Sequence, residues 1–399
     1  MALPASPLTI GFDAKRAAQN STGLGNYSRL VIEALSCHAD DILCKETIDG
    51  GKADTAPTRL CLYMPDPRRT DMLGRLPSLQ GVELKFPRRR PWRWLRALWR
   101  VWGVTADVVA DGVGIYHGLS GELPLNIERA RGVKSVVTVH DLIFLRYPQL
   151  YKPIDRWIYT YKFRRACNVA DRIIAISECT KRDIMSHFGI PAEKIDVVYQ
   201  GCDPAYAIPS GTEKRAEVRD RYALPSRYVL YVGSIEARKN LILLAKALPL
   251  LRDKDVKVIA VGRRTAEAER IDAFVDANGL RDRFRMIHGV PFADLPTLYQ
   301  MAEVFVYPSR FEGFGIPMLE AVTSGTPAIG CTGSCLEEAG GPSSLYVHPD
   351  DAGALAAAID SVLSDETLRH KMIAAGHAWA ARFSTRQMAA DLLKVYSRV

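Results

Sequence analysis

The sequence predicts an α/β protein with two doubly wound parallel sheets, each covered by helices on both faces. A chain of 399 residues is longer than one ordinary domain and suits two domains of about 150–200 residues each. Hydrophobic residues make up 48% of it, which is enough for two cores. In both halves, short β-branched apolar runs alternate with helical stretches, and this alternation is the pattern of βαβ units.

Six apolar runs in each half are expected to form strands. In the first half they are residues 8–12, 59–63, 113–117, 134–139, 172–176 and 195–199. In the second half they are residues 228–232, 256–261, 284–287, 304–307, 327–329 and 345–347. Because ligands of such folds bind at the carboxyl ends of the strands, we expect the two Rossmann-like sheets to face a central cleft.

The segment between the two halves predicts a domain boundary. Residues 203–227 contain three prolines, one glycine and a charged helical stretch. We therefore expect a first domain over residues 1–205 and a second over residues 206–380. The tail, residues 381–399, is helical and could pack back on the first domain.

Composition excludes several classes of protein. The net charge is +8, but residues 88–100 hold six arginines and no acid, so the basic character is local and a general nucleic-acid surface is not expected. No apolar run approaches the roughly 18 residues of a membrane span, and the first residues do not read as a signal peptide. The eight cysteines form no CxxC pair, so reduced thiols and a cytoplasmic protein are expected.

The most informative string is YPSRFEGFGIPMLEA, residues 307–321. A strand is expected to end at Tyr307, and Pro317 suits the first turn of the helix that follows. The backbone amides around Gly313–Ile316 then form a site for an anion or a hydroxyl group at the positive end of the helix. Glu312 precedes this helix and Glu320 lies about one turn inside it, so the two carboxylates can reach different parts of one elongated ligand.

A second string, YVLYVGSIEARKNL, runs from a strand into a turn at Gly233 and then to Arg238 and Lys239. Adjacent Arg and Lys can grip a diphosphate, Arg as a fork and Lys as a point charge. Cations are disfavoured at the start of a helix, so their position there favours an anion nearby. An exposed basic pair is the structural alternative.

Two further motifs follow strands of the first half. His140 and Asp141 end the run VVTVHD, where a histidine at a strand terminus can contact a ligand or can simply be a satisfied structural residue. Gly23 and Gly25 in TGLGNYS let the backbone approach a ligand closely. A third glycine is missing, so this is not a dinucleotide fingerprint.

Taken together, these four strings resemble the motifs of the family 4 glycosyltransferases, which have the GT-B fold. The resemblance runs from about residue 8 to residue 350 and is poor over residues 35–102. It implies that Glu312 and His140 contact the donor sugar and that Glu320 binds the nucleotide ribose. It also implies contacts with the donor sugar or phosphates by Gly23, Gly25, Gly233, Arg238, Lys239, Gly313, Phe314, Gly315 and Ile316.

The implied activity is retaining transfer of a hexose from a nucleotide diphosphate sugar to a glycan or lipid-linked glycan, without a metal. The sequence resembles bacterial polysaccharide mannosyltransferases in particular, so GDP-mannose is the expected donor. A UDP-sugar donor remains an alternative, as do an epimerase or phosphorylase of the same fold and a non-catalytic membrane-anchored binding protein. A nicotinamide-dependent oxidoreductase is disfavoured because its glycine fingerprint is missing.

Residues 87–102, PRRRPWRWLRALWRVW, predict one amphipathic helix. At about 100° per residue, the arginines gather in one sector and the apolar residues in another. A basic, tryptophan-rich helix suits the anionic inner face of a membrane, and the alternative is a helix that packs on its own domain. The residues assigned to this membrane or acceptor contact are Arg89, Trp92, Arg93, Arg96, Trp99 and Arg100.

Overall fold

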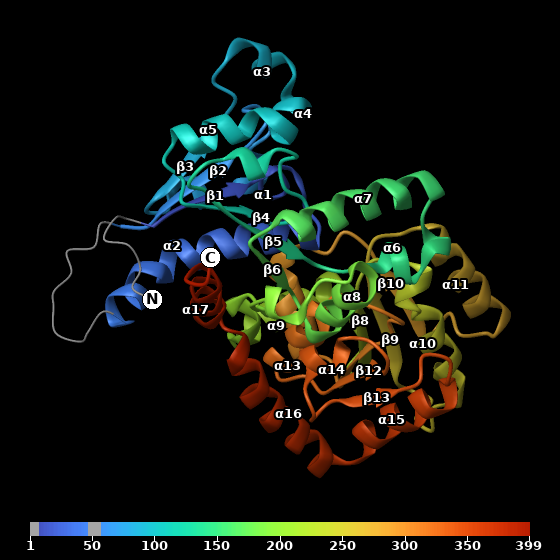
Figure 1. Cartoon of the computed structure of the whole chain (residues 1–399). Helices are drawn as coiled ribbons and strands as arrows, with labels where there is room; N and C mark the ends of the chain where they lie inside the picture. The colour runs from blue at the N-terminus through green and yellow to red at the C-terminus, as the bar shows by residue number, and fades with distance from the viewer. Residues whose placement is uncertain (1–7, 47–56) are drawn as a thin grey trace. The chain divides into compact units, whose positions relative to one another are not determined.

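The computed structural model describes residues 8–46 and 57–399 (Figure 1). The chain divides into two compact units. The first contains the residues up to Gly201 together with Thr385–Val399, and the second is Cys202–Ser384. The boundaries expected from the sequence lie within a few residues of these two divisions.

The first unit is built on a parallel sheet whose strand order is β3-β2-β1-β4-β5-β6-β7. Its strands are β1 (Thr9–Asp13), β2 (Arg59–Tyr63), β3 (Val82–Lys85), β4 (Ile115–Gly118), β5 (Lys134–Val139), β6 (Arg172–Ala175) and β7 (Ile195–Val197). The chain leaves β1 toward β2 and β3, then returns to β4 and continues to β7. Because such crossovers are right-handed, α2 covers one face of the sheet and α5 and α7 cover the other (Figure 1).

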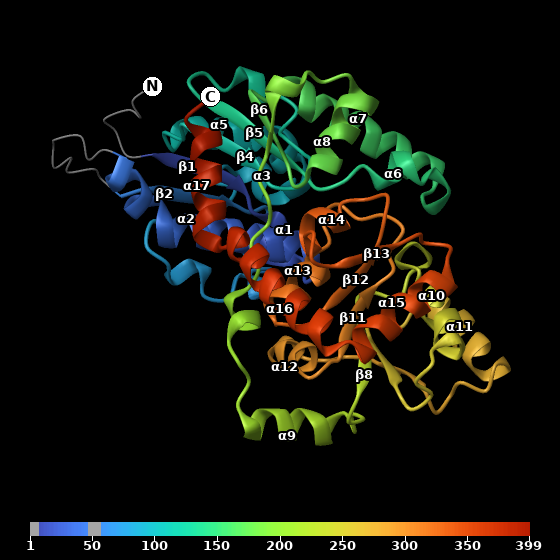
Figure 2. The ribbon, with the colours of Figure 1, turned by 90° about the horizontal axis from the view of Figure 1, so that it is seen from below.

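The helices of the first unit follow the sequence order. They are α1 (Lys15–Gln19), α2 (Gly23–Glu46), α3 (Arg90–Trp94), α4 (Arg96–Leu98), α5 (Val104–Ala110), α6 (Ile143–Arg146), α7 (Pro153–Val169), α8 (Glu178–Phe188) and α17 (Thr385–Tyr396). The side chain of Ser177 caps the start of α8 by accepting from the amide of Thr180, and Gly189 ends that helix in the left-handed conformation. Helix α17 packs along α2 (Figure 2).

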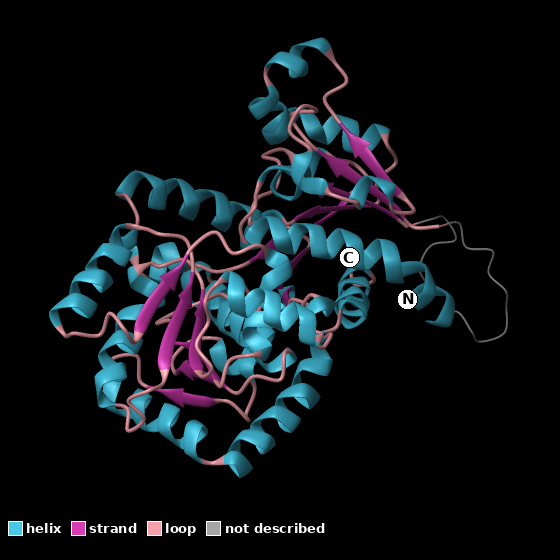
Figure 3. Ribbon diagram, turned by 180° about the vertical axis from the view of Figure 1, so that it is seen from behind, coloured by secondary structure: helices cyan, strands magenta, loops and turns pink. Residues whose placement is uncertain are grey.

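The second unit has a parallel sheet of order β10-β9-β8-β11-β12-β13. Figure 3 shows the strands in magenta and the helices in cyan. Its strands are β8 (Tyr228–Val232), β9 (Lys257–Val261), β10 (Phe284–Ile287), β11 (Val304–Tyr307), β12 (Ala328–Cys331) and β13 (Leu345–Val347). Its helices are α9 (Thr212–Arg221), α10 (Leu241–Ala247), α11 (Ala266–Ala277), α12 (Leu295–Gln300), α13 (Ile316–Thr323), α14 (Leu336–Gly340), α15 (Ala352–Ser364) and α16 (Glu366–Ala380).

The prediction of two doubly wound parallel sheets is confirmed. Every strand expected from the sequence overlaps a strand of the structure, whereas β3 was not expected. The central strands β8 and β11 are buried almost throughout, as strands covered by helices on both faces must be.

Candidate active site

The second sheet has its topological switch point between β8 and β11. From β8 the chain moves outward to β9 and β10, and from β11 it moves in the opposite direction to β12 and β13. In open α/β sheets, ligands bind beyond the carboxyl ends of the two strands that flank such a point. The turns that follow β8 and β11 carry the two strings that the sequence singled out.

The turn after β8 is held against the turn after β11. Gly233 begins it, and a Cβ atom there would lie 3.5 Å from Cδ of Lys239. Residues Ala237–Lys239 then form one turn of 3-10 helix, and Asn240 has a left-handed backbone with φ 57°. The Asn240 amide donates to the carbonyl oxygens of Pro308 and Pro349, at 3.1 and 2.8 Å. Arg238 and Lys239 therefore lie just before α10 in a fixed turn, and not on the helix itself.

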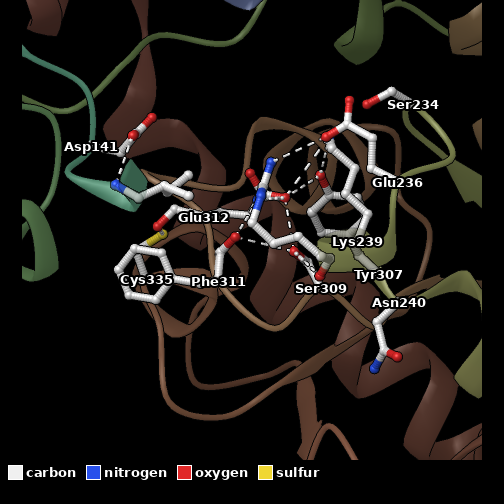
Figure 4. A network of polar contacts seen from close by, with 12 residues as sticks. Asp141, Ser234, Glu236, Lys239, Asn240, Tyr307, Ser309, Phe311, Glu312 and Cys335 are labelled. Atoms are coloured by element: carbon white, nitrogen blue, oxygen red, sulfur yellow. Dashed lines mark hydrogen bonds and ion pairs between the residues drawn. The ribbon is translucent and has the colours of Figure 1, made fainter. Parts of the chain in front are cut away.

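Glu312 lies at the centre of a polar network formed by these two turns (Figure 4). Its Oε1 atom is 2.9 Å from Nη1 of Arg238 and 3.9 Å from Nζ of Lys239. The hydroxyl groups of Tyr307 and Ser309 donate to the same oxygen, at 2.9 and 2.8 Å. All four of these contacts use the same carboxylate oxygen, Oε1.

The surroundings of Glu312 keep its carboxyl group ionised. Burial raises the pKa, but the charges of Lys239 and Arg238 and the hydroxyl donors outweigh burial, so the pKa lies below its ordinary value. Lys239 also donates to the hydroxyl of Tyr307 at 2.9 Å. Nη2 of Arg238 also lies 3.8 Å from the carboxylate of Glu236, so these two turns bring two cations and two carboxylates together.

Glu320 lies on α13, about one turn after the helix begins at Ile316. Gly315 precedes this helix with φ 103°, and Pro317 stands in its first turn as expected. The Glu320 carboxylate accepts a hydrogen bond of 2.8 Å from the hydroxyl of Tyr299. Burial raises the pKa of Glu320, so the two carboxylates of the motif have opposite shifts.

His140 follows β5 in the first unit and is buried. Its Nε2 atom lies 2.8 Å from the carbonyl oxygen of Leu119, and because a carbonyl can only accept, Nε2 carries the proton. Burial lowers the pKa of His140 to about 4, so the ring is neutral near pH 7 and Nδ1 is a hydrogen-bond acceptor. Asp141 accepts from the amide of Ile143 at 3.1 Å and thus caps the following turn.

Behind His140 lies a buried hydrogen-bonded chain that sequence reasoning missed. Nε2 of His117 is 2.8 Å from the hydroxyl of Thr138, and its Nδ1 is 2.7 Å from the hydroxyl of Tyr396 in α17. The Tyr27 hydroxyl lies 3.3 Å from that of Thr138, and its ring meets the His140 ring edge-on with 4.5 Å between centroids. His117 on β4 pairs with Val136 on β5, and Thr138 lies two residues further along β5, on the same face as Val136. The sequence gives no other signal for this chain, because Tyr27 and Tyr396 come from distant segments.

Gly23 and Gly25, which the sequence predicts to lie close to a ligand, belong to a helix and not to a loop. Both lie in the first turn of α2. A Cβ atom at Gly25 would lie 1.8 Å from the carbonyl oxygen of Asn20, so this glycine lets the helix approach the protein's own backbone. Gly23 has no atom within 4 Å of such a position. Their contact with donor phosphates stays a prediction.

The arginine–tryptophan segment is not one helix, and this corrects the sequence prediction. It comprises α3, α4 and a π-helical turn, Trp99–Gly103, with a break at Leu95, where φ is −98° and ψ is 52°. Trp99 is 1% exposed and donates to Asp107 at 2.7 Å. Neither Trp99 nor Arg100 therefore belongs to an exposed face.

Of the remaining residues of that segment, some contact the rest of the first unit and others are exposed to solvent. Trp92 is half-buried and packs on the core, and Arg96 forms an ion pair of 2.6 Å with Asp66. Arg89, Arg93 and Trp94 are exposed, with Trp94 at 87%.

Arg100 instead completes a charged cluster at the switch point of the first sheet. Its guanidinium lies 2.6 Å from Asp13, at the end of β1, and 2.7 Å from Glu122, after β4. Lys162 of α7 adds a bond of 3.2 Å to Glu122. Asp13 and Glu122 are far from Arg100 in the sequence, so the sequence held no signal for this cluster.

The two parallel sheets and the cationic turn at a switch point define a class, the GT-B glycosyltransferases. Anabaena HepE, solved in complex with UDP and glucose, has the same fold, with a TM-score of 0.73, 16% identity and coverage of 98% of this chain and 100% of that one. The chain also matches "Glycosyltransferase Family 4" over residues 60–206 and "Glycosyl transferases group 1" over residues 214–379. The protein therefore belongs to the family 4 glycosyltransferases, as its motifs implied.

Two sequence relatives come from Escherichia coli. The O-antigen chain mannosyltransferase B is 33% identical over 71% of this chain and 74% of its own length. The serotype-specific mannosyltransferase WbdA is 28% identical over 67% of this chain, and the match spans about a third (34%) of the longer relative. In the described parts of the chain, no helix combines the length and apolar character that crossing a membrane requires.

Proposed function

We propose that this glycosyltransferase moves mannose from GDP-mannose, with retention of configuration, to a glycan or lipid-linked glycan during bacterial surface polysaccharide synthesis. The similarity to an O-antigen mannosyltransferase along most of both chains supports this choice of sugar and pathway. The observation that carries the proposal is the pairing of Arg238 and Lys239 with Glu312 at the switch point of the second sheet.

In this proposal the diphosphate lies against Arg238 and Lys239. Both side chains are mostly buried, at 12% and 15% exposure, so their charges are little screened by solvent. Glu312 already has donors at Oε1, and its Oε2 atom accepts from the hydroxyls of the sugar. Glu320 accepts from the hydroxyls of the ribose. The backbone of Gly313–Ile316 lines the remaining side of the sugar and phosphates.

The reaction breaks the bond between the anomeric carbon and the diphosphate oxygen. Negative charge then grows on the departing diphosphate, where the two prepositioned cations stabilise it. The acceptor hydroxyl attacks from the same face, forms the new glycosidic bond and gives its proton to the departing phosphate. Four donor groups surround Oε1 of Glu312 and reduce its nucleophilicity, which favours a hydrogen-bonding role over a covalent one.

Roles for residues of the first unit stay predictions. His140, with an accepting Nδ1 atom, is suited to a sugar hydroxyl. The expected contact of the arginine–tryptophan segment with an anionic membrane can involve only its exposed residues, such as Arg89, Arg93 and Trp94.

The purified protein, incubated with labelled GDP-mannose and membranes that carry acceptor, tests the proposal. We expect label to enter the glycan and to be released by an α-mannosidase, because retention preserves the α linkage of the donor. Transfer only from UDP-sugars would overturn the choice of donor. Release only by a β-mannosidase would overturn retention, and conversion of the donor without any acceptor would indicate an epimerase.

A further inference from the structure

The imidazole of His140 is held by one hydrogen bond and by one neighbouring ring. Nε2 donates to the carbonyl oxygen of Leu119 at 2.8 Å. The ring of Tyr27 meets the imidazole at 88°, with 4.5 Å between the two centroids. The torsion that turns a histidine ring has a broad range of favourable values, so a single hydrogen bond does not fix the plane of the ring. The packed ring of Tyr27 supplies the second restraint.

The start of α2 fixes the position of Tyr27. A Cβ atom at Gly25, two residues earlier, would lie 1.8 Å from the carbonyl oxygen of Asn20, so a glycine is required for α2 to begin this close to α1. Arg29 ties the two helices together, because its Nη1 atom donates to the carbonyl oxygens of Ala17 and Asn20 at 2.8 and 3.0 Å. The string TGLGNYS therefore places a tyrosine at a defined point of the first unit.

The hydroxyl end of Tyr27 is anchored as well. Tyr27 is 2% exposed, and its hydroxyl lies 3.3 Å from that of Thr138, which is bonded in turn to His117 and, through it, to Tyr396. Burial lowers the pKa of His117 to about 3, so its ring is neutral and has one donating and one accepting nitrogen. The hydroxyl groups on either side can take either role, so both bonds of His117 are satisfied. Tyr27 is thus held at both ends.

The orientation of the His140 ring decides what its free nitrogen can do. With the proton on Nε2, Nδ1 has a single lone pair, and this lone pair lies in the plane of the ring. Hydrogen bonds weaken steeply when donor and acceptor are misaligned. A ring that turns about its bond to Cβ would therefore lose a hydroxyl group that a fixed ring binds.

We propose that Tyr27 is a positioning residue whose ring fixes the plane of the His140 imidazole, so that Nδ1 accepts from a hydroxyl of the donor sugar. The inference rests on the proposed function, in which His140 contacts that sugar. It gives the string TGLGNYS a role within the first unit that does not require its glycines to touch a phosphate. Tyr27 acts through His140, because its own side chain is buried.

Two substitutions of Tyr27 separate its ring from its hydroxyl. Tyr27→Met fills much of the same space without a ring, and we expect it to lower kcat about tenfold, the scale of losing one aligned hydrogen bond. Tyr27→Phe keeps the ring and loses only the long bond to Thr138, so kcat should stay within about threefold of the wild type. Steady-state kinetics with labelled GDP-mannose measure both. The rise in melting temperature that GDP causes should be the same in all three proteins, because GDP lacks the sugar.

Tyr63→Met is the matched control. Tyr63 also belongs to the first unit and is 2% exposed, and its hydroxyl donates to Asp111 at 2.9 Å. This variant should lose melting temperature as Tyr27→Met does and should keep the wild-type kcat. Equal losses of kcat in these two variants, or a wild-type kcat in Tyr27→Met, would overturn the inference. Tyr27→Leu replaces Tyr27→Met if the latter does not fold, and a tenfold loss in Tyr27→Phe would also count against a role of the ring.

Nitrogen-15 NMR of His140 needs no donor, so it separates this inference from the proposed function. In Tyr27→Met the His140 signal should titrate at a higher pH than in the wild type, because the imidazole loses part of its cover, whereas Tyr63→Met should show the wild-type signal. An unchanged His140 signal in Tyr27→Met would count against the inference alone. A changed signal, together with a wild type that transfers nothing from GDP-mannose, would count against the proposed function alone.

Discussion

Nη1 of Arg238 lies 2.9 Å from Oε1 of Glu312, so the turn after β8 and the turn after β11 are joined by an ion pair. The Arg238 guanidinium also donates to the carbonyl oxygen of Phe311. These contacts orient a cation that is 12% exposed beside a carboxylate that is 13% exposed. The protein's own contacts thus fix this pair, and catalysis by prepositioned charge requires such groups.

Replacing Arg238 or Lys239 by Ala is expected to lower kcat by about 10²–10³, the usual effect of losing one group that stabilises charge in the transition state. Steady-state kinetics with the labelled donor measure this. Arg252→Ala is the matched control, since the Arg252 side chain is 91% exposed, and it should keep wild-type turnover. Near-wild-type turnover in both the Arg238 and Lys239 variants would remove these residues from catalysis.

Donor affinity is expected to weaken on acidification because of Glu320. Burial raises its pKa, so the carboxyl takes up a proton at a higher pH than an ordinary glutamate does. The ionised form accepts ribose hydroxyls more strongly, by about 1 kcal/mol, so affinity should fall by about fivefold once the group is protonated. Calorimetric titration with GDP-mannose between pH 8 and pH 5 measures this, because its phosphates stay ionised there.

In the same titration, Glu320→Gln should bind more weakly and lose this pH dependence. An equally steep dependence in the variant would place the titrating group elsewhere. The pH dependence of the free energy of unfolding has the opposite sign to that of donor affinity. Because the pKa of Glu320 is raised in the folded protein, Glu320 contributes more to stability as the pH falls through that pKa and less above it.

His140 is expected to stay neutral, with its proton on Nε2, between pH 5.5 and pH 8. Its pKa is lowered to about 4 by burial, and the carbonyl of Leu119 fixes the tautomer. Nitrogen-15 NMR of the imidazole distinguishes the two tautomers, and His140→Asn identifies the signal. A signal that titrates near pH 6.5, or a proton on Nδ1, would contradict this assignment.

Gly315→Ala is expected to destabilise the second unit and to impair donor binding. Gly315 has φ 103°, and a Cβ atom there would lie 2.7 Å from Cδ2 of Leu336. Strain of this kind costs about 1–3 kcal/mol, so the melting temperature should fall. Gly211→Ala is the control, because φ is −65° there and no atom lies within 4 Å. Equal melting temperatures for the two variants would show that the turn before α13 tolerates a side chain.

Strands with continuous apolar runs could be predicted from the sequence, and an edge strand could not. Strands β8 and β11 are apolar over their length because both of their faces are buried. In contrast, β3 at the sheet edge has the sequence VELK, and all four residues are half-exposed. Half-buried edges leave only a short alternating signal, which residues 82–85 share with many turns.

The sequence likewise predicts some residues of the candidate site and not others. Arg238, Glu312 and Glu320 could be found because they occur in short strings, and the structure brings Arg238 and Glu312 into contact. Tyr307 and Tyr299 donate to the two glutamates, but the sequence predicts only a strand end at Tyr307 and gives no signal for Tyr299.

The prediction of one helix over residues 87–102 is wrong because tertiary contacts determine the structure of this segment. Buried carboxylates at Asp13 and Glu122 pair with Arg100, and Asp107 pairs with Trp99. The periodicity of a single segment does not reveal such partners.

The most direct test of the proposed donor site is a crystal structure of the protein with GDP-mannose. The account predicts the diphosphate within hydrogen-bonding distance of Arg238 and Lys239, Oε2 of Glu312 on a mannose hydroxyl, and Glu320 on the ribose. A diphosphate bound elsewhere, with the pair Arg238–Glu312 unchanged and without a ligand, would contradict it.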